Sequence, residues 1–268
     1  MPDRTPFTPT SGQKRPLPGK LIAMAAAALA LVSAAAAPAF ADPVKNIVLV
    51  HGAFADGSGW RRVADILVKD GYTVSIVQEP GTSLADDVAA TNRILDRQSG
   101  PAVLVGHSYG GAVITVAGNN AHVASLVYVA AFAPDEGEKL GPLLTSVAPA
   151  ANSIAPTADG FLLVDPAKFP ADFAADLPAA EARFMAVSQM PLNAAILGTP
   201  ITAPAWKSKH SYGVVATQDR MINPELERTM YKRAGAKVTE IKGSHAVFIS
   251  RAGEVARLIE RAAKESGQ

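Results

Sequence analysis

Val103-Leu-Val-Gly-His-Ser-Tyr-Gly-Gly111 is the most informative stretch of the sequence. An apolar run over residues 101–105 leads into a Gly-x-Ser-x-Gly pentapeptide, and residues 111–117 have the composition of a helix. A strand, a sharp turn and a helix in this order are the context in which such a serine becomes a nucleophile. The turn crowds the positions two before and two after Ser108, where glycine has no Cβ to clash. The pentapeptide alone would arise by chance in about one chain of ten at this length, so Ser108 is a candidate that needs support from the rest of the chain.

Composition narrows the class of protein. The chain has 268 residues, of which 49% are hydrophobic, which suits one sizeable domain with an insertion and argues against disorder. It has no cysteine, which excludes disulfides, cysteine nucleophiles and thiolate metal sites. The formal net charge is +1 and no basic patch is interleaved with aromatic residues, so the sequence gives no reason to expect a nucleic-acid partner.

Residues 1–41 are predicted to be a signal peptide. Basic residues precede an uncharged apolar run over residues 21–37, and an A-x-A site predicts cleavage after Ala41. A transmembrane anchor is the alternative, since about 17 apolar residues lie at the short end of the spanning range. The run is rich in alanine and the cleavage site is well placed, so we expect an exported protein, periplasmic or secreted, with no stable membrane anchor after processing. No cysteine follows the run, which excludes a lipoprotein.

Strands and helices alternate in the rest of the chain. Short apolar runs predict strands at 46–50, 72–77, 102–105, 125–130, 212–217 and 236–241. Helical spacing predicts helices at 60–69, 84–97, 111–117, 224–233 and 254–264. This alternation predicts an α/β fold, with a mostly parallel sheet covered by helices on both faces. Functional groups in such sheets gather at the carboxyl ends of the strands.

Residues 135–206 interrupt this alternation. The segment is rich in alanine and proline, yet it carries too many phenylalanine, methionine and leucine residues for a linker. An unstructured loop of about 70 residues is improbable in a compact domain. We therefore predict a helical cap inserted into a core formed by residues 42–134 and 207–268, with short helices such as 180–189.

A serine nucleophile needs a base, and the base needs a third group to orient it. Ser108, Asp219 and His245 each follow a predicted strand, so all three are expected at the same edge of the sheet. The other histidines are poorer bases, because they lie in turns where the backbone matters more or before strands, at the opposite edge: His51, His107, His122 and His210. Two other carboxylates follow the strand after the serine and are alternatives for the acid: Asp135 and Glu136.

Acyl transfer also needs two donors directed at the developing oxyanion. The backbone N–H of Tyr109, directly after the serine, is the first candidate. The loop after the first strand, His-Gly-Ala-Phe over residues 51–54, would supply the second, from Ala53 or alternatively from Phe54. Read alone, this loop could be a plain strand-to-helix turn. Its occurrence together with the serine, the acid and the histidine favours an oxyanion hole.

The chain resembles the α/β-hydrolase fold superfamily over the whole of residues 42–268. The motifs that carry the resemblance are Val48-Leu-Val-His-Gly-Ala53, Val105-Gly-His-Ser-Tyr-Gly-Gly111, Val215-Ala-Thr-Gln-Asp219 and Gly243-Ser-His245. The His-Gly-Ala opening followed by Gly59-Trp60 is similar to the branch that holds plant methylesterases, hydroxynitrile lyases and many bacterial esterases. This resemblance implies a carboxylic-ester hydrolase that forms an acyl-enzyme through Ser108, His245 and Asp219, without a metal or organic cofactor. Hydroxynitrile lyases of this branch use a cap lysine, and no familiar pattern surrounds the cap lysines here, Lys139 and Lys168.

The predicted activity is the hydrolysis of small-molecule esters. The apolar side chains of the cap favour a small apolar or aromatic substrate, although they could equally serve only to pack the cap on the sheet. The same residues could support lactone opening, perhydrolysis, C–C cleavage or hydroxynitrile lysis, and the fold can also serve as a ligand-binding module. The intact serine, histidine and aspartate argue against a non-catalytic role. The sequence has no Walker loop, dinucleotide fingerprint or H-E-x-x-H motif.

Overall fold

A computed structural model of the chain describes residues 44–147 and 150–267. The predicted signal peptide lies outside these residues. None of the helices in the described part is both long enough and apolar enough to span a bilayer.

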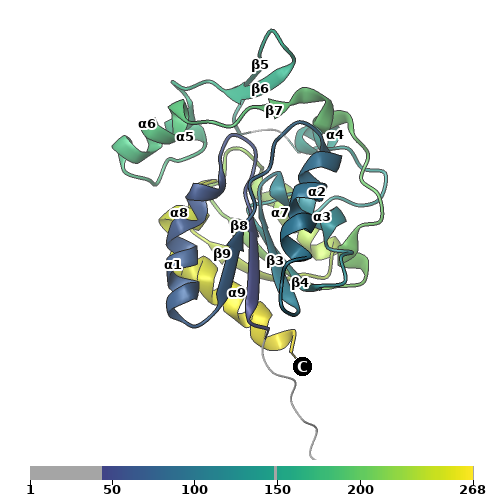
Figure 1. The fold of residues 1–268 in the computed structure, drawn as a ribbon. Coiled ribbons are helices and arrows are strands. Elements are labelled where there is room, and N and C mark those ends of the chain that lie inside the picture. Colours follow the sequence, from purple (N-terminus) through teal and green to yellow (C-terminus); the bar gives the residue numbers. More distant parts are fainter. Residues whose placement is uncertain (1–43, 148–149, 268) are drawn as a thin grey trace, which may run out of the picture. The chain divides into compact units, whose positions relative to one another are not determined.

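A six-stranded sheet forms the centre of the fold (Figure 1). Its strands are β1 (Asn46–Val50), β2 (Thr73–Ile76), β3 (Ala102–His107), β4 (Val123–Val129), β8 (His210–Ala216) and β9 (Lys237–Ile241). They lie in the order β2-β1-β3-β4-β8-β9, and every neighbouring pair is parallel. All residues of β1 and β3 are buried, because helices cover both faces of a parallel sheet. The predicted fold class is confirmed.

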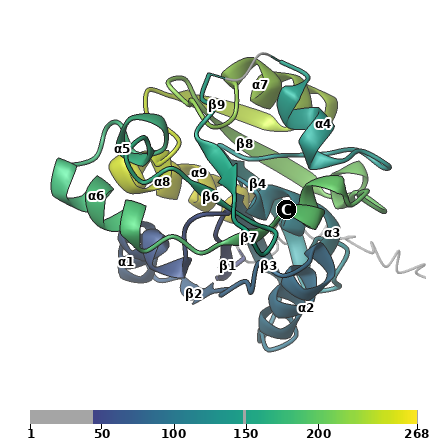
Figure 2. The same ribbon diagram turned by 90° about the horizontal axis from the view of Figure 1, so that it is seen from above.

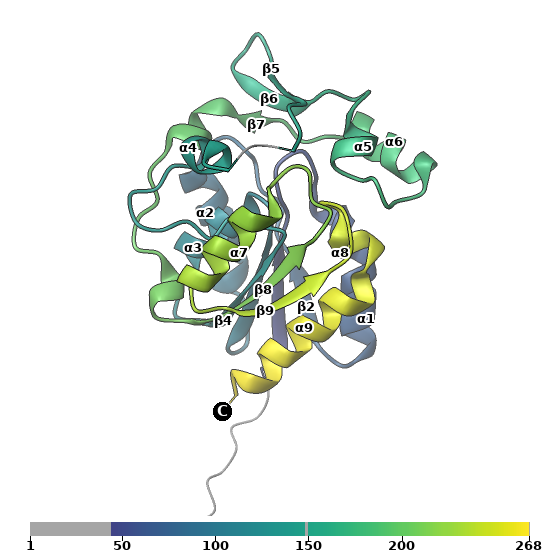
Figure 3. The same cartoon turned by 180° about the vertical axis from the view of Figure 1, so that it is seen from behind.

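Helices form a layer on each face of the sheet. One layer contains α1 (Arg61–Lys69), α8 (Val247–Ser250) and α9 (Ala252–Glu265), and the other contains α2 (Leu84–Leu95), α3 (Gly110–Ala117) and α7 (Pro224–Arg233). Figure 3 shows the two layers on opposite sides. The predicted bounds of these helices and strands are close to the observed ones. The sequence analysis placed His210 before its strand, whereas it is the first residue of β8. It still lies at the amino edge, far from Ser108.

Local signals in the sequence explain where several helices begin. The Ser83 hydroxyl accepts the backbone N–H of Asp86 at 3.0 Å, so it caps the first turn of α2. The Asn223 side chain accepts the N–H of Glu225 at 3.0 Å, and Pro224 occupies the first position of α7, where a missing N–H costs nothing. These caps fix the loops that precede the helices, including the loop that carries Asp219.

The segment between β4 and β8 lies over the carboxyl edge of the sheet (Figures 1 and 2). It contains the helices α4 (Leu140–Thr145), α5 (Phe169–Asp172) and α6 (Ala179–Val187), and a second, antiparallel sheet of β5 (Ile154–Pro156), β6 (Phe161–Val164) and β7 (Leu192–Asn193). The helix predicted over 180–189 corresponds to α6. The sequence predicted short helices in a cap and did not predict the additional strands β5 to β7, which are too short to show an alternating pattern.

Candidate active site

Ser108 occupies a sharp turn between β3 and α3. Its φ angle is +52°, in the left-handed region that side chains other than glycine rarely adopt. A Cβ on Gly106 would lie 2.5 Å from the Gly110 carbonyl oxygen, and a Cβ on Gly110 would collide with the His51 carbonyl oxygen. Both glycines are therefore required by the close approach of backbone segments. The turn holds the serine above the carboxyl edge of the sheet in a strained conformation.

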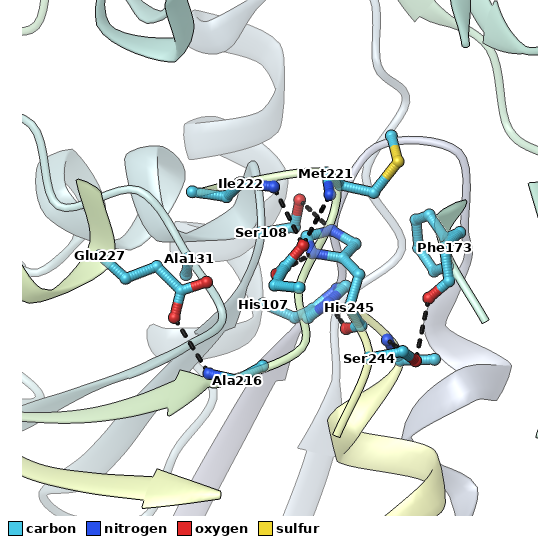
Figure 4. A network of polar contacts seen from close by, with 12 residues as sticks. His107, Ser108, Ala131, Phe173, Ala216, Met221, Ile222, Glu227, Ser244 and His245 are labelled. Atoms are coloured by element: carbon cyan, nitrogen blue, oxygen red, sulfur yellow. Dashed lines mark hydrogen bonds and ion pairs between the residues drawn. The ribbon is translucent and has the colours of Figure 1, made fainter. Parts of the chain in front are cut away.

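The structure brings Ser108, His245 and Asp219 into one chain of hydrogen bonds, and Figure 4 shows Ser108 beside His245. His245 Nε2 lies 2.8 Å from Ser108 Oγ, and His245 Nδ1 lies 2.6 Å from Asp219 Oδ2. Because a carboxylate only accepts, Nδ1 carries the proton and Nε2 is free to accept the serine proton. The imidazole is buried and packs against Phe173 and His107, with ring centroids 4.7 Å apart in both cases. These contacts restrict the His245 imidazole to one orientation.

Backbone donors hold the carboxylate of Asp219 in place. Its Oδ1 accepts the N–H of Met221 at 2.7 Å and the N–H of Ile222 at 3.0 Å. The alternative acid Asp135 lies elsewhere, because its carboxylate pairs with Lys207 at 2.7 Å. Lys207 Nζ also lies 3.7 Å from Glu136, the second alternative. The geometry thus favours Asp219 as the partner of the histidine.

Two backbone N–H groups beside Ser108 are available to an oxyanion. Within the described residues, neither the N–H of Ala53 nor that of Tyr109 is bonded to an acceptor. The N–H of Phe54, the alternative donor, already donates to the Met190 carbonyl at 3.2 Å. This bond leaves Ala53 as the better second donor.

Asp87, on α2, supports this region and was not identified from the sequence. Its Oδ2 accepts the Tyr109 hydroxyl at 2.5 Å, and its Oδ1 accepts the Gly81 N–H at 2.8 Å. Burial raises the pKa of the Asp87 carboxyl, while the bonds from Tyr109 and Gly81 oppose that rise. Asp87 thereby ties the residue after the serine to the loop before α2.

Replacing Tyr109 by phenylalanine is expected to destabilise the protein by about 1.5–3 kcal/mol, because a buried carboxyl loses its hydroxyl donor. Urea unfolding measures the change. The matched control is Tyr72→Phe, since the Tyr72 hydroxyl has no hydrogen-bond partner in the described part of the chain, and its cost should stay below about 0.5 kcal/mol. Equal losses for the two variants would contradict the role of Asp87.

The rings of His51 and His107 have structural roles that the sequence did not indicate. His51 Nε2 accepts the Glu79 N–H at 2.9 Å, so Nδ1 carries the proton and donates to the Gly52 carbonyl at 2.9 Å. His107 Nε2 donates to the His245 carbonyl oxygen at 2.9 Å. Burial lowers the pKa of both imidazoles, which keeps them neutral. The two rings therefore anchor the loops on either side of Ser108.

Asp176, in the loop between α5 and α6, holds the loop that carries His245. It accepts a hydrogen bond from the Ser244 hydroxyl, the Ser244 N–H at 3.1 Å and the Ser250 hydroxyl at 2.7 Å. Burial alone would raise the pKa of Asp176, but these bonds outweigh it and the pKa is lowered. The segment above the sheet is thus fastened to the histidine loop by an ionised carboxylate.

We expect Asp176→Ala to cost about 2–3 kcal/mol of stability and to lower kcat, because bonds from hydroxyl and N–H donors to a carboxylate are lost beside His245. Thermal unfolding and ester turnover report the two effects. Asp159→Ala, an exposed aspartate of the same segment, is the control and should change neither. Unchanged stability and kcat in Asp176→Ala would show that the hydrogen bonds from Ser244 and Ser250 to Asp176 are not needed for either property.

An apolar hollow opens beside the Ser108 hydroxyl. Its empty volume is about 480 Å³, a figure that includes space open to solvent. Besides Ser108, Tyr109 and His245 it is lined by Ala53, Phe54, Phe132, Leu140, Leu144, Ile154, Leu162, Leu192, Leu197, Met221 and Ile222. Among the described residues no lysine lines it, and the cap lysines Lys139 and Lys168 are exposed. The hollow therefore offers mainly apolar contacts to a small ligand.

Comparison with known proteins gives a family and a fold. A profile described as the alpha/beta hydrolase family matches residues 47–258. Over 118 residues the chain is 36% identical to the carbendazim hydrolyzing esterase of Nocardioides sp. (strain SG-4G). This stretch covers 39% of the present chain and 49% of that esterase, so the match spans about half the length of the relative.

Solved structures resemble most of the chain. A pyrethroid hydrolase from Sphingobium faniae JZ-2 has a TM-score of 0.70 and 22% identity, covering 82% of this chain and 97% of its own. An extracellular alpha/beta-hydrolase from a Paenibacillus species has a TM-score of 0.69 and 18% identity, covering 82% and 99%. At these identities the similarity concerns the fold.

Proposed function

The chain belongs to the alpha/beta hydrolase family, and we propose that it is a serine esterase that cleaves small apolar or aromatic carboxylic esters through an acyl-enzyme. One observation carries the proposal. Ser108, His245 and Asp219 are joined by bonds of 2.8 and 2.6 Å directly at the wall of an apolar hollow. The esterase named among its relatives is consistent with it.

We propose one step for each group. Ser108 Oγ attacks the ester carbonyl while His245 Nε2 takes its proton, and the N–H groups of Ala53 and Tyr109 receive the oxyanion. His245 then gives the proton to the departing alcohol, which leaves an acyl-Ser108 ester. A water molecule, deprotonated by His245, attacks this ester and releases the acid. Asp219 orients the imidazole and stabilises its positive charge throughout.

The apolar lining of the hollow supports the substrate class that we propose. Apolar residues from 135–206 line the same hollow as Ser108, among them Leu140, Ile154 and Leu192. We propose that this segment acts as a cap that selects the acyl or alcohol group by burying its apolar surface. Each buried methylene contributes about 0.8 kcal/mol, so kcat/KM should rise from an acetate to a butyrate ester until the hollow is filled.

Burst kinetics with p-nitrophenyl acetate and butyrate test the acyl-enzyme directly. A rapid release of one p-nitrophenol per enzyme, followed by slower turnover, is the expected result. An organophosphonate should label Ser108 once and abolish that burst, and mass spectrometry of the labelled peptide identifies the site. Labelling at a different serine, or turnover that survives labelling, would refute the proposal.

We also propose that the protein is exported and cleaved after Ala41, on the strength of the apolar run and the A-x-A site in the sequence. The expected N-terminus of protein purified from the extracytoplasmic fraction is Asp42. N-terminal sequencing measures it, and an intact Met1 in that fraction would contradict cleavage.

A further inference from the structure

Glu227, on α7, has a carboxyl group that is fully buried beside Asp219. Its Oε2 accepts the N–H of Ala216, the last residue of β8, at 3.1 Å, a bond drawn in Figure 4. No donor among the described residues reaches its Oε1. Burying a carboxyl oxygen without a hydrogen-bond partner costs free energy. The group that lies next to Glu227 therefore decides whether this cost is offset.

The group within hydrogen-bonding reach of Glu227 is itself a carboxyl, that of Asp219. Two ionised carboxylates both only accept, so a bond between them requires that one keeps its proton. Asp219 receives two backbone N–H groups on Oδ1 and His245 Nδ1 on Oδ2. Glu227 receives a single backbone N–H. The negative charge is therefore better stabilised on Asp219, and the proton belongs to Glu227.

The charge of Arg228 lowers the pKa of Glu227, but this effect is smaller than those of burial and of Asp219, which raise it. Arg228 is the next residue of α7, but its guanidinium binds Glu225 and Glu240 at the surface. The Tyr231 hydroxyl on α7 is fully used, because it accepts the Ala131 N–H and donates to the Ala131 carbonyl. On β4, the Tyr128 hydroxyl lies 3.1 Å from the Thr115 hydroxyl.

Burial, reinforced by the charge of Asp219, raises the pKa of Glu227 well above its usual value. The other titratable groups near Glu227 are tyrosine hydroxyls, with His245 lying beyond Asp219. Tyr231 and Tyr128 are neutral phenols, since burial raises the pKa of each. Among the described residues, Asp219 is therefore the charge that acts most strongly on Glu227, and the opposing effect of Arg228 is smaller.

We propose that Glu227 is a neutral carboxylic acid at neutral pH and that it donates its proton to Asp219 as a positioning residue, an inference that rests on the proposed function. The donated bond completes the set of donors around Asp219 and keeps that carboxylate ionised and aimed at His245 Nδ1. His245 then retains the tautomer whose Nε2 can accept the serine proton. A neutral amide could do the same, whereas an alkyl side chain could not.

Turnover of p-nitrophenyl butyrate tests the positioning role. Glu227→Leu should lower kcat by about tenfold or more, since a bond to a charged group is lost, with little change in KM. Glu227→Gln should recover most of that loss, because its amide N–H donates to Asp219 and its oxygen still accepts from Ala216. Glu225→Gln, the same exchange on the exposed side of α7, is the control. Wild-type kcat in a folded Glu227→Leu protein would overturn the role.

The pH dependence of the melting temperature tests the proton separately from activity. The unfolded chain ionises Glu227 near its usual pKa, whereas the folded chain keeps the proton to higher pH. The stabilising effect of that proton is complete below about pH 4.5 and is lost as the pH rises toward the folded pKa. Glu227→Gln has no carboxyl proton to lose. The difference between its Tm and that of the wild type should therefore rise by roughly 3–5 °C per pH unit from about pH 5 upward.

The turnover and melting-temperature measurements can contradict different parts of the proposal. Parallel Tm curves for wild type and Glu227→Gln would overturn the protonated state, whether or not either protein is an esterase. Diverging Tm curves for proteins without ester turnover would keep the proton assignment and reject the positioning role together with the proposed function. Glu225→Gln should follow the wild-type curve, because its side chain is exposed.

Discussion

Ser108→Ala is expected to lower the kcat for p-nitrophenyl butyrate by roughly four to six orders of magnitude. The methyl group cannot form the acyl-enzyme, so only the oxyanion donors and substrate binding remain. Because the side chain is small and, within the described part of the chain, forms one hydrogen bond, to His245, the fold should survive the change. Stopped-flow absorbance at a saturating ester concentration measures the rate and the burst together.

The control for this variant is a serine outside the site. Ser208→Ala removes a hydroxyl whose only hydrogen bond among the described residues, at 3.3 Å, is to the Ala205 carbonyl. It should retain wild-type turnover. Comparable rates for Ser108→Ala and wild type would remove the nucleophile from the proposed mechanism.

Asp219→Asn is expected to lower kcat by about 10⁴-fold, the second largest effect. The introduced amide would present either a donor to His245 Nδ1 or a weaker, uncharged acceptor. In the first case the imidazole changes tautomer and Nε2 carries a proton that blocks acceptance from Ser108. In the second, the imidazolium loses its counter-charge. Measured pH profiles of kcat/KM for wild type and variant would detect both outcomes.

Asp135→Asn is the matched comparison, because Asp135 was the other acid that the sequence allowed. Its carboxylate pairs with Lys207 at 2.7 Å, with both side chains partly exposed, so its loss should cost less than about 1 kcal/mol and leave kcat unchanged. Loss of turnover in Asp135→Asn with retention in Asp219→Asn would reverse the assignment of the acid.

The sequence predicted the features that local patterns encode. Continuous apolar runs identified β1 and β3. Because Ser108, Asp219 and His245 each follow a predicted strand, the sequence also placed them at one edge of the sheet. The small sheet of β5 to β7 was missed, because strands of two to four residues carry no readable alternation. An alanine-rich and proline-rich composition gave no other indication of it.

The supporting carboxylates could not be predicted from the sequence. Asp87 bonds a residue 22 positions away and Asp176 bonds residues 68 and 74 positions away. Each is a single acidic residue, and a solvent-exposed carboxylate at the same position would give the same sequence pattern. A weak signal existed for Glu227, which lies on the inward stripe of α7 with Leu226, Met230 and Tyr231, where an acid is out of place.

The bonds from Asp176 to Ser244 and Ser250 have a consequence for protein engineering. Exchanging residues 135–206 for the corresponding segment of a homologue is an attractive way to alter selectivity, since these residues line much of the hollow. The exchange would also remove the anchor of the His245 loop. A successful chimera would therefore have to keep an aspartate at position 176, opposite the resident Ser244 and Ser250, so a change of selectivity made in this way must also preserve turnover.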